Sequence, residues 1–231
     1  MNRKHNFEID EYYHIYNRGT DKRIIFLEKH DYHRFILLLY FCNSREPVDL
    51  QLIFREGRTF AELFNLPKGK SIVAIGAWCL MPNHFHLLLK ETVENGITEF
   101  MRKVSTGYSV YFNNKYNRSG SLFQGKFKSE HLNNDRYLKY IFSYIHLNPI
   151  KLIPGESKWT ENGIKKLNEA EKFLKQYEYS SFNSYAKERS NYSNMINKSE
   201  FPEYFPAIED SVKEIREWLD FKDSAKVRPS Q

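Results

Sequence analysis

At residues 81–89 the chain reads Met81-Pro82-Asn83-His84-Phe85-His86-Leu87-Leu88-Leu89. Apolar residues approach and leave the histidine pair, which predicts a buried strand. On a strand, residues i and i+2 project from one face, so His84 and His86 stand side by side while Phe85 points into a core on the other face. Two neighbouring imidazoles can chelate one metal ion. In the alternative, structural interpretation they stay neutral and find hydrogen-bond partners.

The segments around this stretch predict strands and helices in alternation. Residues 71–80 and 84–91 are expected to pair as antiparallel strands, and weaker strand patterns cover 12–16 and 126–132. Helical spacing of apolar residues predicts helices at 30–43, 97–112 and 133–148. Asn133, Asn134 and Asp135 suit the start of the last helix, and Pro149 should end or kink it.

Length and composition indicate one folded domain with an extension. The chain has 231 residues, 41% of them hydrophobic and 16% aromatic, enough for a sizeable core. Residues 44–70 contain Pro and Gly and are predicted to form a variable excursion with a short helix near 60–64. Beyond residue 155 the sequence becomes polar, with helices predicted at 164–177 and 211–221.

The sequence also indicates the cellular compartment of the protein. No apolar run reaches the roughly 20 residues that a membrane span needs, so no membrane association is expected. Cys42 and Cys79 have no Cys-x-x-Cys spacing and are interpreted as reduced core thiols. A cytoplasmic protein is therefore expected.

Basic residues are concentrated in one segment. Residues 101–128 contain six basic side chains and no acidic one, which equals the formal net charge of +6 for the whole chain. Aromatic residues are interleaved with them, as suits a nucleic-acid backbone with stacked bases. A solvated helix face above core aromatics explains the charge equally well. The predicted DNA-binding residues in this segment are Arg102, Lys103, Lys115, Arg118, Lys126 and Lys128.

The helix predicted at 133–148 offers a nucleophile and a third metal ligand. Tyr144 and Asn148 are four residues apart and share one helical face. The Asn148 amide oxygen would complete a His-His-Asn ligand set that suits Mg²⁺ or Mn²⁺, with zinc as an alternative. The structural alternative is an aromatic core face ending in an amide. His146 points elsewhere on the helix and is expected to lie at the surface or to support the site from behind its ligands. His14, His30, His33 and His131 show no ligand spacing and are assigned structural roles.

The motifs together resemble those of the REP-associated tyrosine transposases, single-tyrosine members of the HUH nucleases that are related to insertion-sequence transposases. The resemblance covers residues 12–186 and rests on five segments in the same order. Besides 81–89, these are Tyr13-His14-Ile15-Tyr16-Asn17-Arg18-Gly19, the segment 120–128, Tyr144-Ile145-His146-Leu147-Asn148-Pro149-Ile150-Lys151, and the segment 177–182. Tyr179 stands where relatives often have tryptophan, a difference that concerns packing or base contact.

The resemblance implies a fold and a division of the chain. We expect an α+β, ferredoxin-like sandwich in which an antiparallel sheet with helices on one face carries the histidines and a helix carries the tyrosine. Residues 1–155 would form the catalytic domain, with the excursion at 44–70, and residues 156–231 a polar, partly helical C-terminal extension. The resemblance covers neither the excursion nor the tail beyond about residue 187.

The resemblance also implies a reaction. His84, His86 and Asn148 would hold Mg²⁺ or Mn²⁺, and Tyr144 would attack single-stranded DNA beside a hairpin to form a 5′-phosphotyrosine. Arg18, after the first strand, is a further candidate DNA contact. A homodimer that pairs Tyr144 with the partner's histidines is possible in such a family. Two alternatives remain open: a hairpin-binding protein that has lost turnover, and a zinc hydrolase that adds a distant carboxylate or histidine to His84 and His86.

Overall fold

The computed structural model describes residues 7–186, apart from positions 48, 50–52 and 54–56, together with residues 190 and 192–203. Its centre is a four-stranded sheet in the order β2-β3-β1-β4. The strands are β1 (Tyr12–Arg18), β2 (Val73–Met81), β3 (His84–Glu91) and β4 (Lys128–His131). All three pairings are antiparallel. This sheet, with helical segments between β1 and β2 and a long helix between β3 and β4, confirms the predicted ferredoxin-like α+β class.

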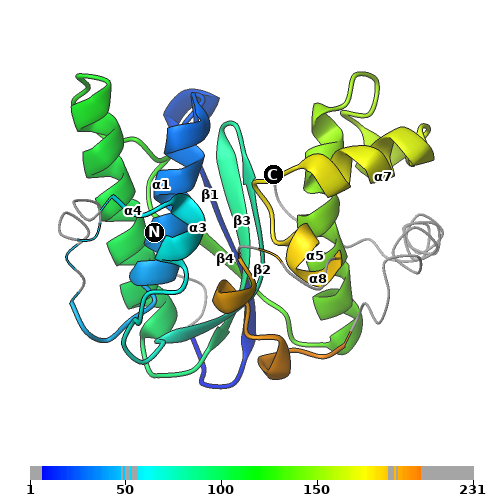
Figure 1. Cartoon of the computed structure of the whole chain (residues 1–231). Coiled ribbons are helices and arrows are strands. Elements are labelled where there is room, and N and C mark those ends of the chain that lie inside the picture. Colours follow the sequence, from blue (N-terminus) through cyan, green and yellow to red (C-terminus); the bar gives the residue numbers. More distant parts are fainter. Residues whose placement is uncertain are drawn as a thin grey trace.

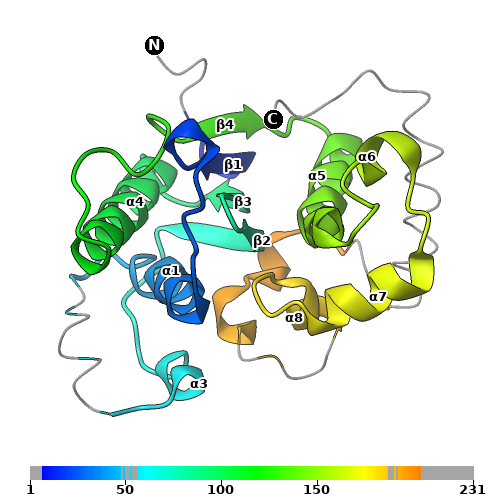
Figure 2. The ribbon, with the colours of Figure 1, turned by 90° about the horizontal axis from the view of Figure 1, so that it is seen from above.

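Helices cover both faces of the sheet (Figures 1 and 2). On one face lie α1 (Lys29–Phe41) and α4 (Gly96–Lys115), which pack with Phe85, Leu87 and Leu89 of β3 in the larger hydrophobic cluster. On the other face lies α5 (Asp135–Leu147), which packs with Leu88 in the second cluster. The expectation of helices on one face therefore describes only α1 and α4. Because both faces are covered, all nine residues of β2 are buried.

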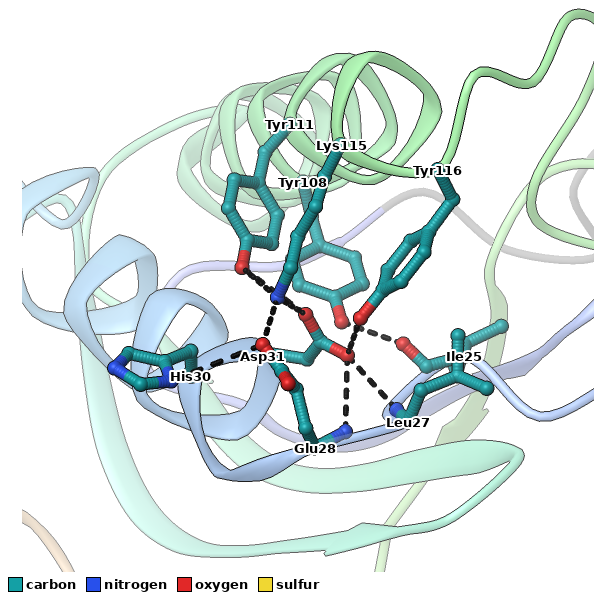
Figure 3. Close-up of polar contacts among 9 residues, drawn as sticks. All are labelled: Ile25, Leu27, Glu28, His30, Asp31, Tyr108, Tyr111, Lys115 and Tyr116. Carbon is teal, nitrogen blue, oxygen red and sulfur yellow. Dashed lines mark hydrogen bonds and ion pairs between the residues drawn. The ribbon is translucent and has the colours of Figure 1, made fainter.

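A buried carboxylate joins the two helices of the first face. Asp31 in α1 is fully buried, and its oxygens accept hydrogen bonds from the backbone N–H groups of Leu27 and Glu28. From α4 and the residue after it, Tyr111, Lys115 and Tyr116 donate to the same carboxylate at 3.0, 2.7 and 2.8 Å. Figure 3 shows these side chains converging on Asp31. The start of α1 is thereby tied to the end of α4.

The C-terminal extension folds back along the outer edge of β2. It contains α6 (Trp159–Asn162), α7 (Leu167–Gln176), α8 (Phe182–Ala186) and the 3₁₀ turns η3 (Ser193–Met195) and η4 (Lys198–Glu200). The backbone N–H of Leu80 donates to the carbonyl of Tyr179 at 2.9 Å, and the N–H of Ser181 donates to the carbonyl of Trp78 at 2.9 Å. Further along the strand, Asn197 accepts from the N–H of Ile75 and donates its own N–H to the Ile75 carbonyl.

The remaining elements agree with the sequence interpretation where they are described. The short helix expected near 60–64 is α3 (Phe60–Leu63), and the helix expected at 164–177 is α7. The helix expected at 211–221 lies outside the described residues. The division at residue 155 stays a prediction. In the part of the chain described here, no helix is long and apolar enough to cross a membrane.

Candidate active site

The predicted histidines open onto a pocket of about 270 Å³ at the end of the sheet where β1 finishes and β3 begins. The β1–β3 register places Arg18 opposite His84 and Tyr16 opposite His86, so these four side chains share the face that α5 covers. The full lining is Tyr16, Asn17, Arg18, Lys22, Asn83, His84, Phe85, His86, Gln124, Lys128, Tyr144 and Lys151. These lining residues include four cationic side chains and no acidic one, which suits a polyanionic ligand.

The two imidazoles lie as the strand period predicts. Their ring centroids are 5.0 Å apart with the planes nearly perpendicular. Burial lowers the pKa of His84 to about 4, with Lys151 and Arg18 adding to the effect. Burial, followed by the neighbouring imidazoles, lowers the pKa of His86 well below its ordinary value. Both rings are therefore neutral near pH 7, which is the form that ligates a metal.

Tyr144 reaches this pocket from α5. Its ring centroid lies 5.4 Å from that of His86, with the two planes at 82°. The helix ends at Leu147 and continues as the 3₁₀ turn η2 (Asn148–Leu152), which carries Lys151 back over Tyr144. The Lys151 Nζ donates a hydrogen bond to the Tyr144 Oη at 3.3 Å and lies 5.1 Å from the ring centroid. The structure thus brings together Tyr144 and the histidine pair, as predicted. It also places beside Tyr144 the ammonium group of Lys151, a residue to which the sequence analysis gave no role.

Asn148 is fully buried one turn beyond Tyr144. Among the described residues, its Oδ1 and Nδ2 atoms have no hydrogen-bond partner, and neither has the buried Nε2 of His86. Buried polar atoms without partners are uncommon in folded proteins, and a bound ion or water is one of the explanations for them. Two neutral imidazoles and an amide oxygen are suitable donors for Mg²⁺ or Mn²⁺. The two imidazoles at the pocket fit such a cation, whereas Asn148 is not among the residues that line the pocket.

His14 lies against the pair of histidines, although sequence reasoning assigned it a structural role. Its Nε2 is 2.9 Å from the Nδ1 of His86, and its Nδ1 is 3.6 Å from the Oε2 of Glu130. His14 is fully buried, and burial lowers its pKa despite the nearby carboxylate. Alternation along β1 places His14 on the same face as Tyr16 and Arg18, but only the pairing of β1 with β3 reveals its partner.

His146 faces away from the pocket, as its helical phase predicts. Its Nε2 lies 2.8 Å from the Ser181 Oγ, among Phe142, Phe182 and Tyr185. It is buried rather than exposed, because the C-terminal extension covers it. His146 therefore belongs to the contact between α5 and the extension.

The predicted DNA-binding residues fall into two groups. Arg18 and Lys128 line the pocket, where Arg18 donates from Nε to Gln124, and Lys126 is exposed just before β4. The others lie on α4 or directly after it, and α4 covers the other face of the sheet. Lys103 pairs with Glu99, Lys115 with Asp31 and Glu28, and Arg118 with Asn113, whereas Arg102 is exposed. The structure does not bring this second group to the histidines.

Part of the chain, including the predicted metal ligands and nucleophile, matches a known protein family. A family model described as "Transposase IS200 like" matches residues 49–148. This match confirms the resemblance to insertion-sequence transposases. It includes His84, His86, Tyr144 and Asn148, and it leaves out His14 and Lys151. No curated protein matches the chain.

One solved structure resembles the chain over most of its length. Its title is "Structure of the REP associates tyrosine transposase bound to a REP hairpin". The two sequences are 12% identical, the alignment covers 79% of this chain and 83% of the other, and the TM-score is 0.46.

Proposed function

We propose that this chain is a tyrosine transposase that cleaves and rejoins single-stranded DNA beside a hairpin. In this proposal Tyr144 is the nucleophile, and His84, His86 and Asn148 hold Mg²⁺ or Mn²⁺. The observation that carries it is the position of the Tyr144 ring, 5.4 Å from His86 and in contact with a lysine ammonium. The match to IS200-like transposases over residues 49–148 supports the same reaction class.

The reaction is a phosphodiester exchange. The Tyr144 Oη loses its proton and forms a bond to the phosphorus, while the bond from phosphorus to the 3′ oxygen of the preceding nucleotide breaks. That oxygen takes a proton and leaves as a 3′-hydroxyl, and the 5′ phosphate stays on Tyr144. A second 3′-hydroxyl can reverse the step and join a new strand without ATP, because the energy of the broken ester is retained in the phosphotyrosine.

The side chains of the pocket have separate tasks in this exchange. Lys151 lies beside the phenol oxygen and stabilises the negative charge that ionisation places there. Arg18, Lys22 and Lys128 provide positive charge around the pocket for the phosphates on either side of the cleaved bond. When bound, Mg²⁺ or Mn²⁺ supplies Lewis-acid polarisation of a non-bridging oxygen of the scissile phosphate.

The first alternative, hairpin binding without turnover, predicts tight binding of the hairpin and no covalent adduct. The second, a zinc hydrolase, needs a third histidine or acidic ligand. Within the described residues, no three His, Cys, Asp or Glu side chains are arranged to hold a metal, so no observation favours this alternative. A homodimer with exchanged tyrosines stays a prediction, and the contact of Tyr144 with its own chain's His86 makes exchange unnecessary for assembling the site.

The test uses single-stranded oligonucleotides from the flanking repeats of the encoding locus, each with its hairpin. With Mn²⁺ or Mg²⁺ present, we expect a covalent protein–DNA adduct that resists denaturing electrophoresis. The Tyr144→Phe variant should form none. The matched control is Tyr140→Phe, which removes the neighbouring hydroxyl from a ring stacked on Tyr144 at 6.1 Å but not part of the pocket lining.

Two results would contradict the proposal. Adduct formation by Tyr144→Phe at the wild-type level excludes Tyr144 as the nucleophile. Tight hairpin binding without any adduct, with either cation, supports the binding protein without turnover instead.

A further inference from the structure

A chain of polar side chains runs behind His86, away from the pocket. It begins at Glu130 on β4, passes through His14 on β1 and ends at His86 on β3. The pairing registers explain this arrangement, since His14 lies opposite Glu130 in one ladder and Tyr16 lies opposite His86 in the other. The three side chains consequently point from the same face, toward α5.

Glu130 acts as an acceptor in this chain. Its Oε1 accepts the hydroxyl of Tyr16 at 3.1 Å, and its Oε2 accepts the hydroxyl of Tyr137 at 2.8 Å. Burial, followed by Glu130 itself, raises the pKa of Tyr137, which keeps that phenol protonated as a donor. Both oxygens of Glu130 are therefore occupied by donors, as is expected of a carboxylate.

This carboxylate selects the tautomer of His14. The Nδ1 of His14 is buried, and Glu130 Oε2 lies 3.6 Å away. At that distance a proton on Nδ1 is attracted to the carboxylate, whereas a bare Nδ1 would direct its lone pair at a negative charge. A neutral imidazole carries one proton only, so a proton on Nδ1 leaves Nε2 as an acceptor.

The choice at His14 determines the tautomer of His86. The 2.9 Å contact joins His14 Nε2 to His86 Nδ1, and one of these nitrogens must donate. With His14 Nε2 as the acceptor, the proton lies on His86 Nδ1. The Nε2 of His86 is then bare, and this is the buried atom that has no partner among the described residues.

His84 reaches the same state by a separate route. Its Nδ1 lies 2.6 Å from the Oδ1 of Asn83, and the Nδ2 of Asn83 donates to the carbonyl of Lys22 at 3.2 Å. The second contact orients the Asn83 amide so that its oxygen faces His84, which places the proton on His84 Nδ1. Both histidines then have Nε2 as the nitrogen that can bind a cation.

We propose that Glu130 and His14 are positioning residues that hold His86 in its Nδ1–H tautomer, leaving Nε2 unprotonated for a divalent cation. The use of that cation rests on the proposed function, whereas the tautomer does not. Acceptors behind a ligating histidine commonly fix its ring orientation and tautomer, and removing them weakens metal binding. His14 and Glu130 touch neither DNA nor the reacting atoms in this assignment.

The direct test is nuclear magnetic resonance of the metal-free full chain with ¹⁵N-labelled histidine rings, near neutral pH. Signals of His84 and His86 are assigned with the variants His84→Gln and His86→Gln. We expect both rings to carry the proton on Nδ1. A proton on Nε2 of His86 would overturn the proposal, and this readout needs neither metal nor DNA.

A second measurement tests the consequence for metal binding. In His14→Phe the ring shape is kept, and Glu130 retains its two tyrosine donors. We expect the Kd for Mn²⁺ to rise by about 10- to 100-fold relative to wild type. The matched control is His131→Phe, which removes an imidazole paired with Glu11 at 2.8 Å on the same strand pair but not connected to His86. Its Kd for Mn²⁺ should stay within about twofold of wild type.

The outcomes separate this inference from the proposed function. An unchanged Kd for Mn²⁺ in folded His14→Phe overturns the positioning role. Should His14→Phe fail to fold, the wild-type tautomer measurement decides by itself. Absence of a DNA adduct, together with the expected tautomer and Mn²⁺ binding, contradicts only the proposed function. Absence of Mn²⁺ binding by wild type contradicts the proposed cation site, and the tautomer is still measured.

Discussion

The Lys151 ammonium donates a hydrogen bond to the Tyr144 hydroxyl at 3.3 Å and covers the same ring. Because the two residues are joined by the short turn η2, this contact is built into the end of α5. We expect Lys151→Met to slow adduct formation at saturating DNA by about a hundredfold, as loss of one charge-stabilising donor does in other enzymes. Lys151→Arg should keep part of the rate.

The control for this variant is Lys22→Met, which removes a different cation from the pocket lining and leaves the Lys151 contact with Tyr144 in place. It should weaken DNA binding and leave the single-turnover rate at saturation near that of wild type. Equal rates for Lys151→Met and wild type would show that Lys151 has no part in activating the tyrosine.

Substitutions of Asn148 test whether its amide is a metal ligand or a purely structural group. Both of its buried amide atoms lack partners among the described residues, which costs about 1–3 kcal/mol for such a group. We therefore expect Asn148→Leu to raise the free energy of unfolding of the metal-free protein while weakening Mn²⁺ binding. Asn148→Asp should retain Mn²⁺ binding, because it keeps an oxygen donor. Urea unfolding and Mn²⁺ titration measure the two effects, and a destabilised Asn148→Leu variant with unchanged Mn²⁺ affinity would identify the amide as purely structural.

The basic residues are expected to contribute unequally to DNA binding. Lys128 lines the pocket, whereas Arg102 lies on α4, which covers the other face of the sheet. Lys128→Gln should weaken hairpin DNA binding and reduce the slope of log Kd against log salt by about one. Arg102→Gln should leave both quantities unchanged. Equal losses in the two variants would mean that the whole segment 101–128 acts as one binding surface.

Asp31 is expected to determine stability rather than chemistry. In Asp31→Asn, the NH₂ of the new amide would face groups that donate to the carboxylate in the wild type. The substitution also leaves Lys115 without its buried, negatively charged partner. Loss of one member of a buried pair costs about 3–5 kcal/mol, which urea unfolding would detect. Glu28→Gln, which alters a half-exposed partner of the same lysine, should cost less than about 1 kcal/mol. A comparable cost for both variants would show that burial does not set the strength of this network.

The sequence predicts the elements of this fold well, because its apolar residues follow the strand and helix periods closely. His84, Phe85 and His86 alternate as expected, and Tyr144 reaches the histidine pair from α5. Asn148 lies in η2 and not among the residues that line the pocket, so its place in the ligand set stays a prediction. The position of α5 on the second face of the sheet does not follow from its own pattern, since most of its residues from Leu138 onward are buried. The face on which α5 packs depends on the order in which the strands pair and on where the C-terminal extension packs.

The supporting residues of the site were harder to predict for a related reason. His14 and Glu130 are 116 positions apart, and neither has a spacing that marks a ligand; only the order of the strands makes them neighbours. Lys151 follows Tyr144 by seven residues, so a continuous helix would place it on the same side but about 10 Å further along the axis. The 3₁₀ turn η2 replaces the helix here, and helix periodicity alone does not predict the contact between the two side chains. Long-range strand pairing and local turn geometry, rather than residue type, decide these contacts.

The way the extension lies along β2 restricts how copies of this protein can associate. Side chains and backbone from residues 177–197 already satisfy outward polar groups of Ile75, Gly76, Trp78 and Leu80. An exposed strand edge invites another chain to add to the sheet, in ordered dimers and in aggregates alike. The C-terminal extension covers this edge at β2. We therefore expect two molecules that share a sheet to pair through β4, which carries Glu130, the carboxylate beside His14.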